Sequence, residues 1–142
     1  MIRTVVLPDD LPAILLLEQT LFPENYIGEV LLRGEIEVGL AWVIGQPAYA
    51  YALVRTDGSL VDLTRLGVLP EWQGCGLGHK LLDKVLGLGK ETMLTVSKIN
   101  QRALALYLRY GFRIVAHHPA AWVMRRPRYS TRTEYSTPQA HR

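Results

Sequence analysis

The chain has 142 residues but only one cysteine, Cys75. It therefore cannot form an intramolecular disulfide or a zinc site built from several thiolates, and we expect no metal. No apolar run approaches the roughly 20 residues that a membrane-spanning helix needs, and the N-terminus does not resemble a signal peptide. We therefore expect a cytoplasmic protein without a membrane partner. At this length the chain can bury a normal core within one domain.

Acidic residues are scarce at the C-terminal end, where the last eighteen residues hold only Glu134. The arginines of the same segment are Arg125, Arg126, Arg128, Arg132 and Arg142. Without this segment the chain has 11 basic and 12 acidic residues, so the net charge of +3 is a local property. This distribution disfavours nucleic acid as a partner. We expect a folded domain over residues 1–126 and a solvated, basic polar tail over residues 127–142.

The apolar periodicity predicts the element order β-α-α-β-β-β-α-β-α-β-β, which indicates an α/β (α+β) fold with helices flanking a mixed sheet. The expected helices run from about Pro12 to Thr20, Tyr26 to Arg33, Gly76 to Leu86, and Asn100 to just before Gly111. The expected strands are Ile2–Leu7, Glu37–Val43, Ala48–Arg55, Leu60–Val68, Thr92–Val96, Phe112–His117 and Ala121–Arg126. Pro8-Asp9-Asp10 is expected to cap the first helix. Asp57-Gly58 predicts a tight turn within an antiparallel meander.

The segment Gln73-Gly74-Cys75-Gly76-Leu77-Gly78-His79 lies between a predicted strand and a predicted helix. Such a turn directs backbone N–H groups at one point, where the helix dipole also favours an anion. The nucleoside-triphosphate motif is absent, and the dinucleotide motif G-x-G-x-x-G fails because its third glycine would fall on His79. A third pattern, [QR]-x-x-G-x-[GA], is met by Gln73, Gly76 and Gly78. On this hexapeptide alone, a plain strand–helix connection explains the glycines equally well.

Two flanking segments extend this pattern. Leu66-Gly67-Val68-Leu69-Pro70 precedes the turn, and Asn100-(x2)-Ala103-(x3)-Tyr107-(x3)-Gly111-Phe112 follows it. Together the three segments closely resemble the GNAT superfamily of acetyl-coenzyme A-dependent N-acetyltransferases, over about Leu60 to Met124. The resemblance implies a mixed central sheet with a bulged, splayed central strand and about four flanking helices. It also implies an acyltransferase that uses acetyl-CoA as co-substrate.

The resemblance assigns the coenzyme A pyrophosphate to backbone N–H groups of the turn, namely those of Gln73, Gly74, Cys75, Gly76, Leu77, Gly78 and His79. Gly76 and Gly78 are expected to adopt unusual φ values and to let the backbone approach the phosphate oxygens. Gly67 matches the bulge of the central strand. There the pantetheine arm would bond to Leu66 and Val68, and a backbone N–H would polarise the acetyl carbonyl. Asn100 resembles the asparagine that contacts the coenzyme, and a plain helix-capping role is compatible with that.

Tyr107 matches the family tyrosine that protonates the departing thiolate. A phenol with a pKa of about 10 suits proton transfer to a thiolate of similar basicity. Packing on an amphipathic helix is the alternative role for this side chain. Cys75 is expected to contribute only its backbone, because no histidine-based activation is evident.

The general base is less clear from the resemblance. Glu18-(x3)-Phe22-Pro23 resembles the RimI-type N-terminal acetyltransferases, but their glutamate base falls five residues before Asn100, where this chain has Thr95. The histone-acetyltransferase branch places a glutamate six residues before the position of Val68, which here is Asp62. Asp62 is thus the candidate base, acting through water, although an aspartate at a strand entrance explains it equally well. The weaker candidates are His117 and His118.

A site without a strong base favours an acceptor amine of low pKa. At pH 7, neutralising an α-amino group of pKa about 7.7 costs roughly 1 kcal/mol, whereas a lysine of pKa about 10.4 costs about 4.6 kcal/mol. We therefore expect a peptide or protein N-terminus, or a small amine, to attack the thioester directly in a ternary complex. The glutamate missing at Thr95 motivates an alternative of another class, an acyl-CoA-binding regulatory module without catalysis. The acceptor and a homodimeric arrangement stay open.

Overall fold

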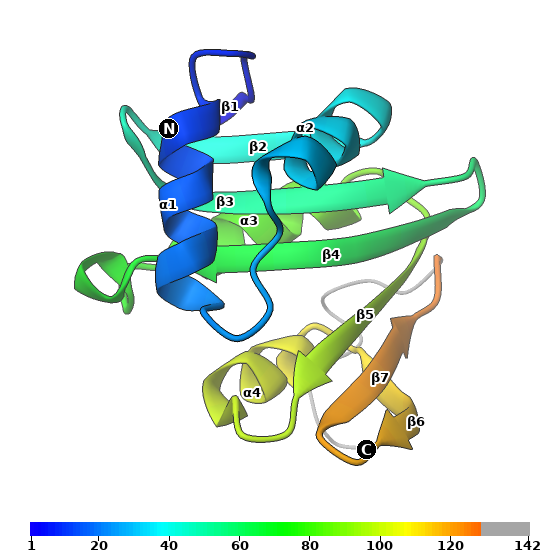
Figure 1. Cartoon of the computed structure of the whole chain (residues 1–142). Coiled ribbons are helices and arrows are strands. Elements are labelled where there is room, and N and C mark those ends of the chain that lie inside the picture. Colours follow the sequence, from blue (N-terminus) through cyan, green and yellow to red (C-terminus); the bar gives the residue numbers. More distant parts are fainter. Residues whose placement is uncertain (129–142) are drawn as a thin grey trace. The chain divides into compact units, whose positions relative to one another are not determined.

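The structure is a computed structural model that describes residues 1–128 of the chain. Within these residues the order of strands and helices is the one predicted, with a short 3-10 helix η1 (Pro70–Trp72) added. The strands, shown in Figure 1, are β1 (Ile2–Thr4), β2 (Leu40–Gly45), β3 (Ala48–Thr56), β4 (Leu60–Val68), β5 (Glu91–Ser97), β6 (Arg113–His118) and β7 (Ala121–Arg126). The helices are α1 (Leu11–Leu21), α2 (Glu29–Val38), α3 (Leu77–Leu86) and α4 (Gln101–Arg109). The α/β fold class is confirmed.

The chain divides into two compact units. The first comprises Met1–Thr56 and Leu63–Gly87, and the second comprises Asp57–Asp62 and, among the described residues, 88–128. None of the helices in the described part of the chain is long and apolar enough to cross a membrane. The basic tail predicted over residues 127–142 lies, from residue 129 onward, outside the described residues.

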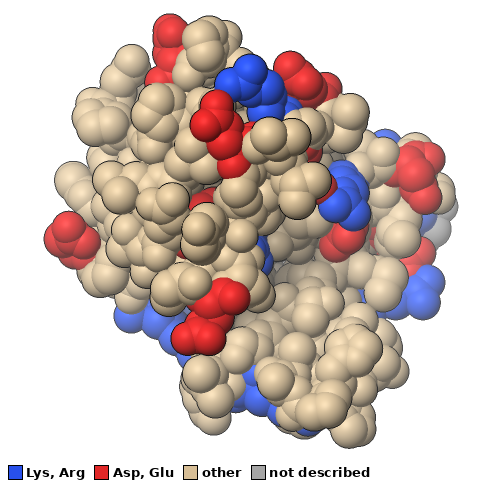
Figure 2. All heavy atoms as spheres, in the orientation of Figure 1, with Lys and Arg blue, Asp and Glu red and all other residues tan. Residues whose placement is uncertain are grey.

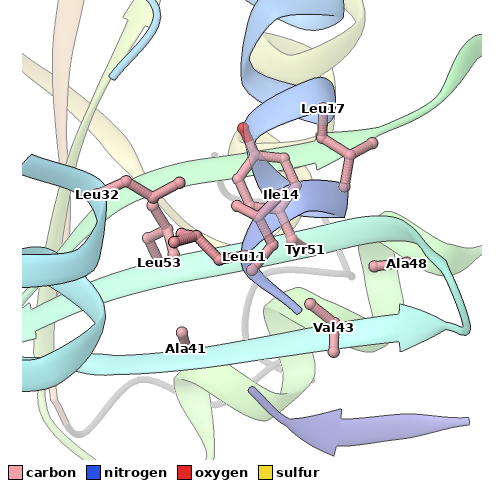
Figure 3. Packing of buried hydrophobic residues seen from close by; sticks show 9 residues of the cluster. All are labelled: Leu11, Ile14, Leu17, Leu32, Ala41, Val43, Ala48, Tyr51 and Leu53. Atoms are coloured by element: carbon pink, nitrogen blue, oxygen red, sulfur yellow. The ribbon is translucent and has the colours of Figure 1, made fainter. Parts of the chain in front are cut away.

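In the first unit the strands follow the order β1-β2-β3-β4, and β2 pairs antiparallel with both β1 and β3. Helices α1 and α2 pack on one face of β3, and α3 lies on the other face (Figure 1). The core below α1 and α2 (Figure 3) contains Leu11, Ile14, Leu17, Leu32, Ala41, Val43, Ala48, Tyr51 and Leu53. Tyr51 and Leu53 of β3 both reach this core because side chains two residues apart on a strand point to the same face.

Helix α2 and the strand after it differ from the prediction. The helix was expected from Tyr26 to Arg33 but runs from Glu29 to Val38, so Glu37 and Val38 are helical and not part of a strand. The alternation of charged and apolar residues over 35–38 resembles that of a strand. In the structure Leu32 and Ile36, four residues apart, both pack against the core of the first unit. A helical face therefore satisfies the pattern better.

The predicted cap of α1 is wrong in its chemistry. Asp10 occupies the N-cap position but makes no side-chain capping bond. Its buried carboxylate instead accepts two hydrogen bonds from the Arg3 guanidinium, at 2.7 and 2.8 Å, and one from the Val6 N–H at 2.8 Å. The bonds from Arg3 hold the pKa of the Asp10 carboxyl below its usual range. The carboxylate thus ties the start of α1 to β1.

In the second unit β7 lies between β5 and β6 and pairs antiparallel with both. Helix α4 follows β5, and the apolar interior includes Leu94, Tyr110, Phe112 and Met124. The buried Arg126 donates a hydrogen bond of 2.7 Å to the Tyr110 carbonyl, which joins β7 to the end of α4.

On the face shown in Figure 2, acidic and basic side chains are scattered among other residues and do not gather into a patch of one sign.

Candidate functional site

The glycine turn (residues 73–79) joins η1 to α3 in the first unit. Gly74 and Gly76 have φ values of +84° and +82°, and Gly76 is the N-cap of α3. The first hydrogen bond inside α3 runs from the Lys80 N–H to the Gly76 carbonyl, at 3.1 Å. The helical amides before Lys80 consequently have no acceptor within the helix, and they lie at the positive end of its dipole. This local geometry suits an anion.

Both glycines are needed for their backbone conformation. A Cβ added at Gly76 would meet nothing within 4 Å, so the space beside it is open. An L-residue in this left-handed conformation costs roughly 1–2 kcal/mol. The prediction of an unusual φ is confirmed for Gly76 but wrong for Gly78, which lies inside the first turn of α3. Gly74 is the other residue of the turn with a positive φ.

The turn is supported by strands of the same unit. The Gln73 side chain donates a hydrogen bond of 3.0 Å from Nε2 to the Val68 carbonyl, which ties the turn to the end of β4. The Trp72 ring stacks on Tyr49 with a centroid distance of 3.9 Å and an interplanar angle of 9°. Cys75 is exposed. The turn is thus held from β3 and β4, and its exposed surface is available to a ligand.

Gly67 is buried within β4, between half-buried Leu66 and Val68. A Cβ added at Gly67 would lie 2.7 Å from Cδ1 of Leu21 and 2.7 Å from Cε1 of Tyr51. Glycine is therefore required because α1 and β3 approach the strand closely. The expected bulge at this position stays a prediction. The structure brings these β4 residues together with the glycine turn in the first unit.

A buried polar cluster lies next to Gly67, and sequence reasoning did not assign it a function. The Glu18 side chain is 0% exposed, and its carboxylate accepts hydrogen bonds from Tyr51 Oη at 2.6 Å, the Ile27 N–H at 2.8 Å and Arg65 Nε at 3.0 Å. Burial is the larger cause and the hydrogen bond to Glu18 the smaller cause of a raised pKa of the Tyr51 phenol, so this donor is neutral. A signal existed in the sequence, since Glu18 lies on the apolar face of α1.

Asn100 and Tyr107, which were also predicted as site residues, belong to the second unit. Asn100 accepts a hydrogen bond of 3.1 Å from the Ala103 N–H, which confirms its capping of α4. Tyr107 lies on α4, buried, with its ring edge-on to Phe112 at 5.6 Å between centroids. Burial raises the pKa of the Tyr107 phenol, so the side chain is protonated at neutral pH.

The candidate bases differ in exposure. Asp62 is half-buried, in the part of β4 that belongs to the second unit. Thr95, at the position where RimI-type enzymes carry their glutamate base, is exposed on β5. His117 and His118 are exposed on β6, and Nδ1 of His117 lies 3.3 Å from Nζ of Lys98. Among the described residues no group of three or more His, Cys, Asp or Glu side chains is arranged to hold a metal ion.

Comparison with known proteins finds similarity to acetyltransferases. A family model described as an acetyltransferase (GNAT) domain matches residues 30–114. An uncharacterized N-acetyltransferase of Mycobacterium tuberculosis is 34% identical in an alignment of 85 residues that covers 51% of this chain and 54% of the relative. The match thus spans about half the length of that curated relative.

Solved structures share the fold over a longer stretch. The ribosomal-protein-S18-alanine N-acetyltransferase from Escherichia coli superposes with a TM-score of 0.76 and 23% identity, covering 100% of this chain and 97% of that one. Arabidopsis thaliana Naa50, in complex with the bisubstrate analogue CoA-Ac-MVNAL, gives a TM-score of 0.74 and 22% identity, covering 88% and 97%. At these identities the similarity concerns the fold.

Proposed function

The chain belongs to the GNAT acetyltransferase family, and we propose that it transfers the acetyl group of acetyl-CoA to a primary amine by direct attack in a ternary complex. The main supporting observation is the glycine turn. Two glycines in the left-handed conformation precede α3, the space beside Gly76 is open, and the amides at the start of α3 have no acceptor within the helix. These features fit the pyrophosphate of coenzyme A.

The donor would be held by the backbone at two places, the glycine turn and β4, and by Asn100. The amides of residues 73–79 would bind the pyrophosphate, and Asn100 would contact the coenzyme while it caps α4. Leu66 and Val68 would pair with the pantetheine arm as an added strand does, and a backbone N–H near Gly67 would polarise the acetyl carbonyl. Acetyl-CoA supplies the activated thioester.

Tyr107 would act as the general acid. As the amine nitrogen bonds to the acetyl carbon, the C–S bond breaks and the thiolate sulfur takes the phenolic proton. Burial raises the pKa of Tyr107. Burial would also raise the pKa of the coenzyme A thiol, because a low-dielectric site disfavours the thiolate as it disfavours the phenolate of Tyr107.

The acceptor would be an α-amino group of a peptide or protein, or a small amine of similar pKa. Asp62, acting through water, would remove its proton. Two structural neighbours support a peptide acceptor by their descriptions: the E. coli enzyme is named for the alanine of ribosomal protein S18, and the plant protein is bound to an analogue containing the peptide MVNAL.

Two measurements test this proposal. Calorimetric titration with coenzyme A should show sub-millimolar binding, and its absence would refute the donor assignment. Turnover should then be measured with a panel of short peptides carrying free N-termini, beside the same peptides blocked at the N-terminus but carrying a lysine. Faster turnover of the free N-termini is expected. Coenzyme binding without turnover of any acceptor would instead support the binding-module alternative.

A further inference from the structure

The buried carboxylate of Glu18 is paired with an arginine that also reaches the loop between α1 and α2. Arg65 donates from Nε to both Glu18 oxygens, at 3.3 and 3.0 Å, and from Nη2 to the Asn25 carbonyl at 2.7 Å. Its guanidinium also lies over the Phe22 ring, 4.2 Å from the centroid. The Arg65 side chain is 15% exposed. A lysine cannot make these contacts together, because it lacks the planar fork of donors.

The α1–α2 loop (residues 22–28) is thus attached at three points by side chains from outside it. Arg65 contacts Phe22 and Asn25, and Glu18 accepts the hydrogen bond of the Ile27 N–H. The loop contains neither helix nor strand. The Glu18–Arg65 pair, which joins α1 to β4, therefore provides all three of these attachments.

The same pair lies beside the proposed position of the reacting carbonyl. Arg65 and Gly67 are two residues apart on β4, so their positions face the same side of the strand. Tyr51 donates to Glu18 and also lies where a Cβ on Gly67 would be. Leu21, the last residue of α1 before the loop, lies there too. The attached loop consequently begins next to Gly67.

Stability alone does not explain such a pair. Replacing a buried ion pair with apolar side chains of similar volume is often neutral or stabilising, because the pair loses its hydration on folding. A direct role of Glu18 as base is also disfavoured, since its oxygens already accept from three donors and its side chain is 0% exposed. The directional contacts of Arg65 point to a role in positioning.

We propose that Glu18 and Arg65 are positioning residues that hold the α1–α2 loop where it orients the acceptor amine beside Gly67. This inference rests on the proposed function, in which the acetyl carbonyl lies at Gly67. The pair contributes to acceptor binding and leaves the donor site unchanged. Its loss should therefore raise KM for the acceptor with little effect on kcat or on coenzyme binding.

The test uses the full chain with both members replaced, Glu18→Leu with Arg65→Met, so that no buried charge is left without a partner. The matched control is Glu35→Leu with Arg55→Met, a pair that joins α2 to β3 in the same unit. Hydrogen exchange of the Ile27 amide, calorimetry with coenzyme A, and kinetics with the fastest peptide of the panel are measured for each. The single variant Arg65→Lys, which keeps the charge, provides a second route if the double variant fails to fold.

In the double variant the Ile27 amide should exchange at least tenfold faster, and acceptor KM should rise about tenfold, with kcat and the coenzyme Kd within about twofold of wild type. Arg65→Lys should show the same pattern with a smaller rise in KM, and the control should show none. Unchanged exchange, or faster exchange without a change in KM, would overturn the proposal. An equal rise in the control would do the same. If the wild type binds coenzyme A but turns over no peptide, the proposed function fails, and the acceptor role of the pair fails with it.

Discussion

Replacing Gly76 with alanine tests whether the glycine turn binds coenzyme A, because the loss of stability and the loss of affinity can be measured separately. Gly76 has a φ of +82°, and a Cβ added there meets nothing within 4 Å. The substitution therefore adds conformational strain without a clash, and we expect it to lower the free energy of unfolding by about 1–2 kcal/mol. For a chain of this size that corresponds to a fall in Tm of roughly 3–6 °C.

Gly76→Ala should also weaken the binding of coenzyme A, beyond its effect on stability. The open space beside Gly76 is where a phosphate oxygen would approach the backbone, and the methyl group would occupy it. Loss of one hydrogen bond to a charged group costs about 1.5–3 kcal/mol, so the Kd for coenzyme A should rise by roughly 10- to 100-fold. Calorimetric titration measures the Kd, and thermal unfolding measures the stability.

Gly58 is the matched control for this prediction. Its φ is +103°, and an added Cβ again meets nothing within 4 Å, but it lies in the turn between β3 and β4. Gly58→Ala should lose a similar amount of stability and keep its affinity for coenzyme A. Wild-type affinity in the Gly76 variant, or an equal loss in the Gly58 variant, would refute the assignment of the turn to the pyrophosphate.

The remaining predictions concern catalysis, packing and pH. Tyr107→Phe should lower turnover by about 10²- to 10⁴-fold with little change in the coenzyme Kd, and unchanged turnover in steady-state assays would exclude the general-acid role. Asp62→Asn should lower kcat/KM throughout about pH 6 to 9, and wild-type activity over that range would exclude it as the base. Gly67→Ala should destabilise the fold by about 1–3 kcal/mol in urea titrations, because its Cβ would collide with buried side chains; a smaller loss would contradict the close packing. The folded-state pKa of Asp10 is lowered, so its pairing with Arg3 should stabilise the fold fully above the unfolded pKa of about 3.9 and lose this effect as pH falls through the folded pKa. Urea titrations of Arg3→Met across acid pH should show a deficit that shrinks with falling pH, and a constant deficit would contradict this.

Local patterns in the sequence predicted much of the fold and the position of the glycine turn that we propose as the donor site. The order of strands and helices follows from apolar periodicity, and Asn100 caps α4 as its position before the helix indicates. The glycine turn could likewise be placed at the start of α3. These features depend on neighbours along the chain, within a few residues, and the sequence displays such neighbours directly.

Other features depend on residues that are distant in sequence. Arg65 and Glu18 are 47 residues apart, and Tyr51 and Glu18 are 33 apart, so no local pattern pairs them. The end of α2 was predicted wrongly because alternation over residues 35–38 fits a strand as well as a helix, and only packing against the core distinguishes the two. The bonding of Asp10 to Arg3 in place of a capping bond has the same origin.

The sequence by itself thus predicted the family and the place of the proposed donor site, because a phosphate site at a helix N-terminus is built from consecutive backbone amides. Only the tertiary structure revealed why Gly67 must be glycine and how the α1–α2 loop is attached. Both depend on side chains that α1, β3 and β4 bring together within the first unit. Burial forces these charged groups to pair, and the partners can be identified only once the helix and the strands have packed.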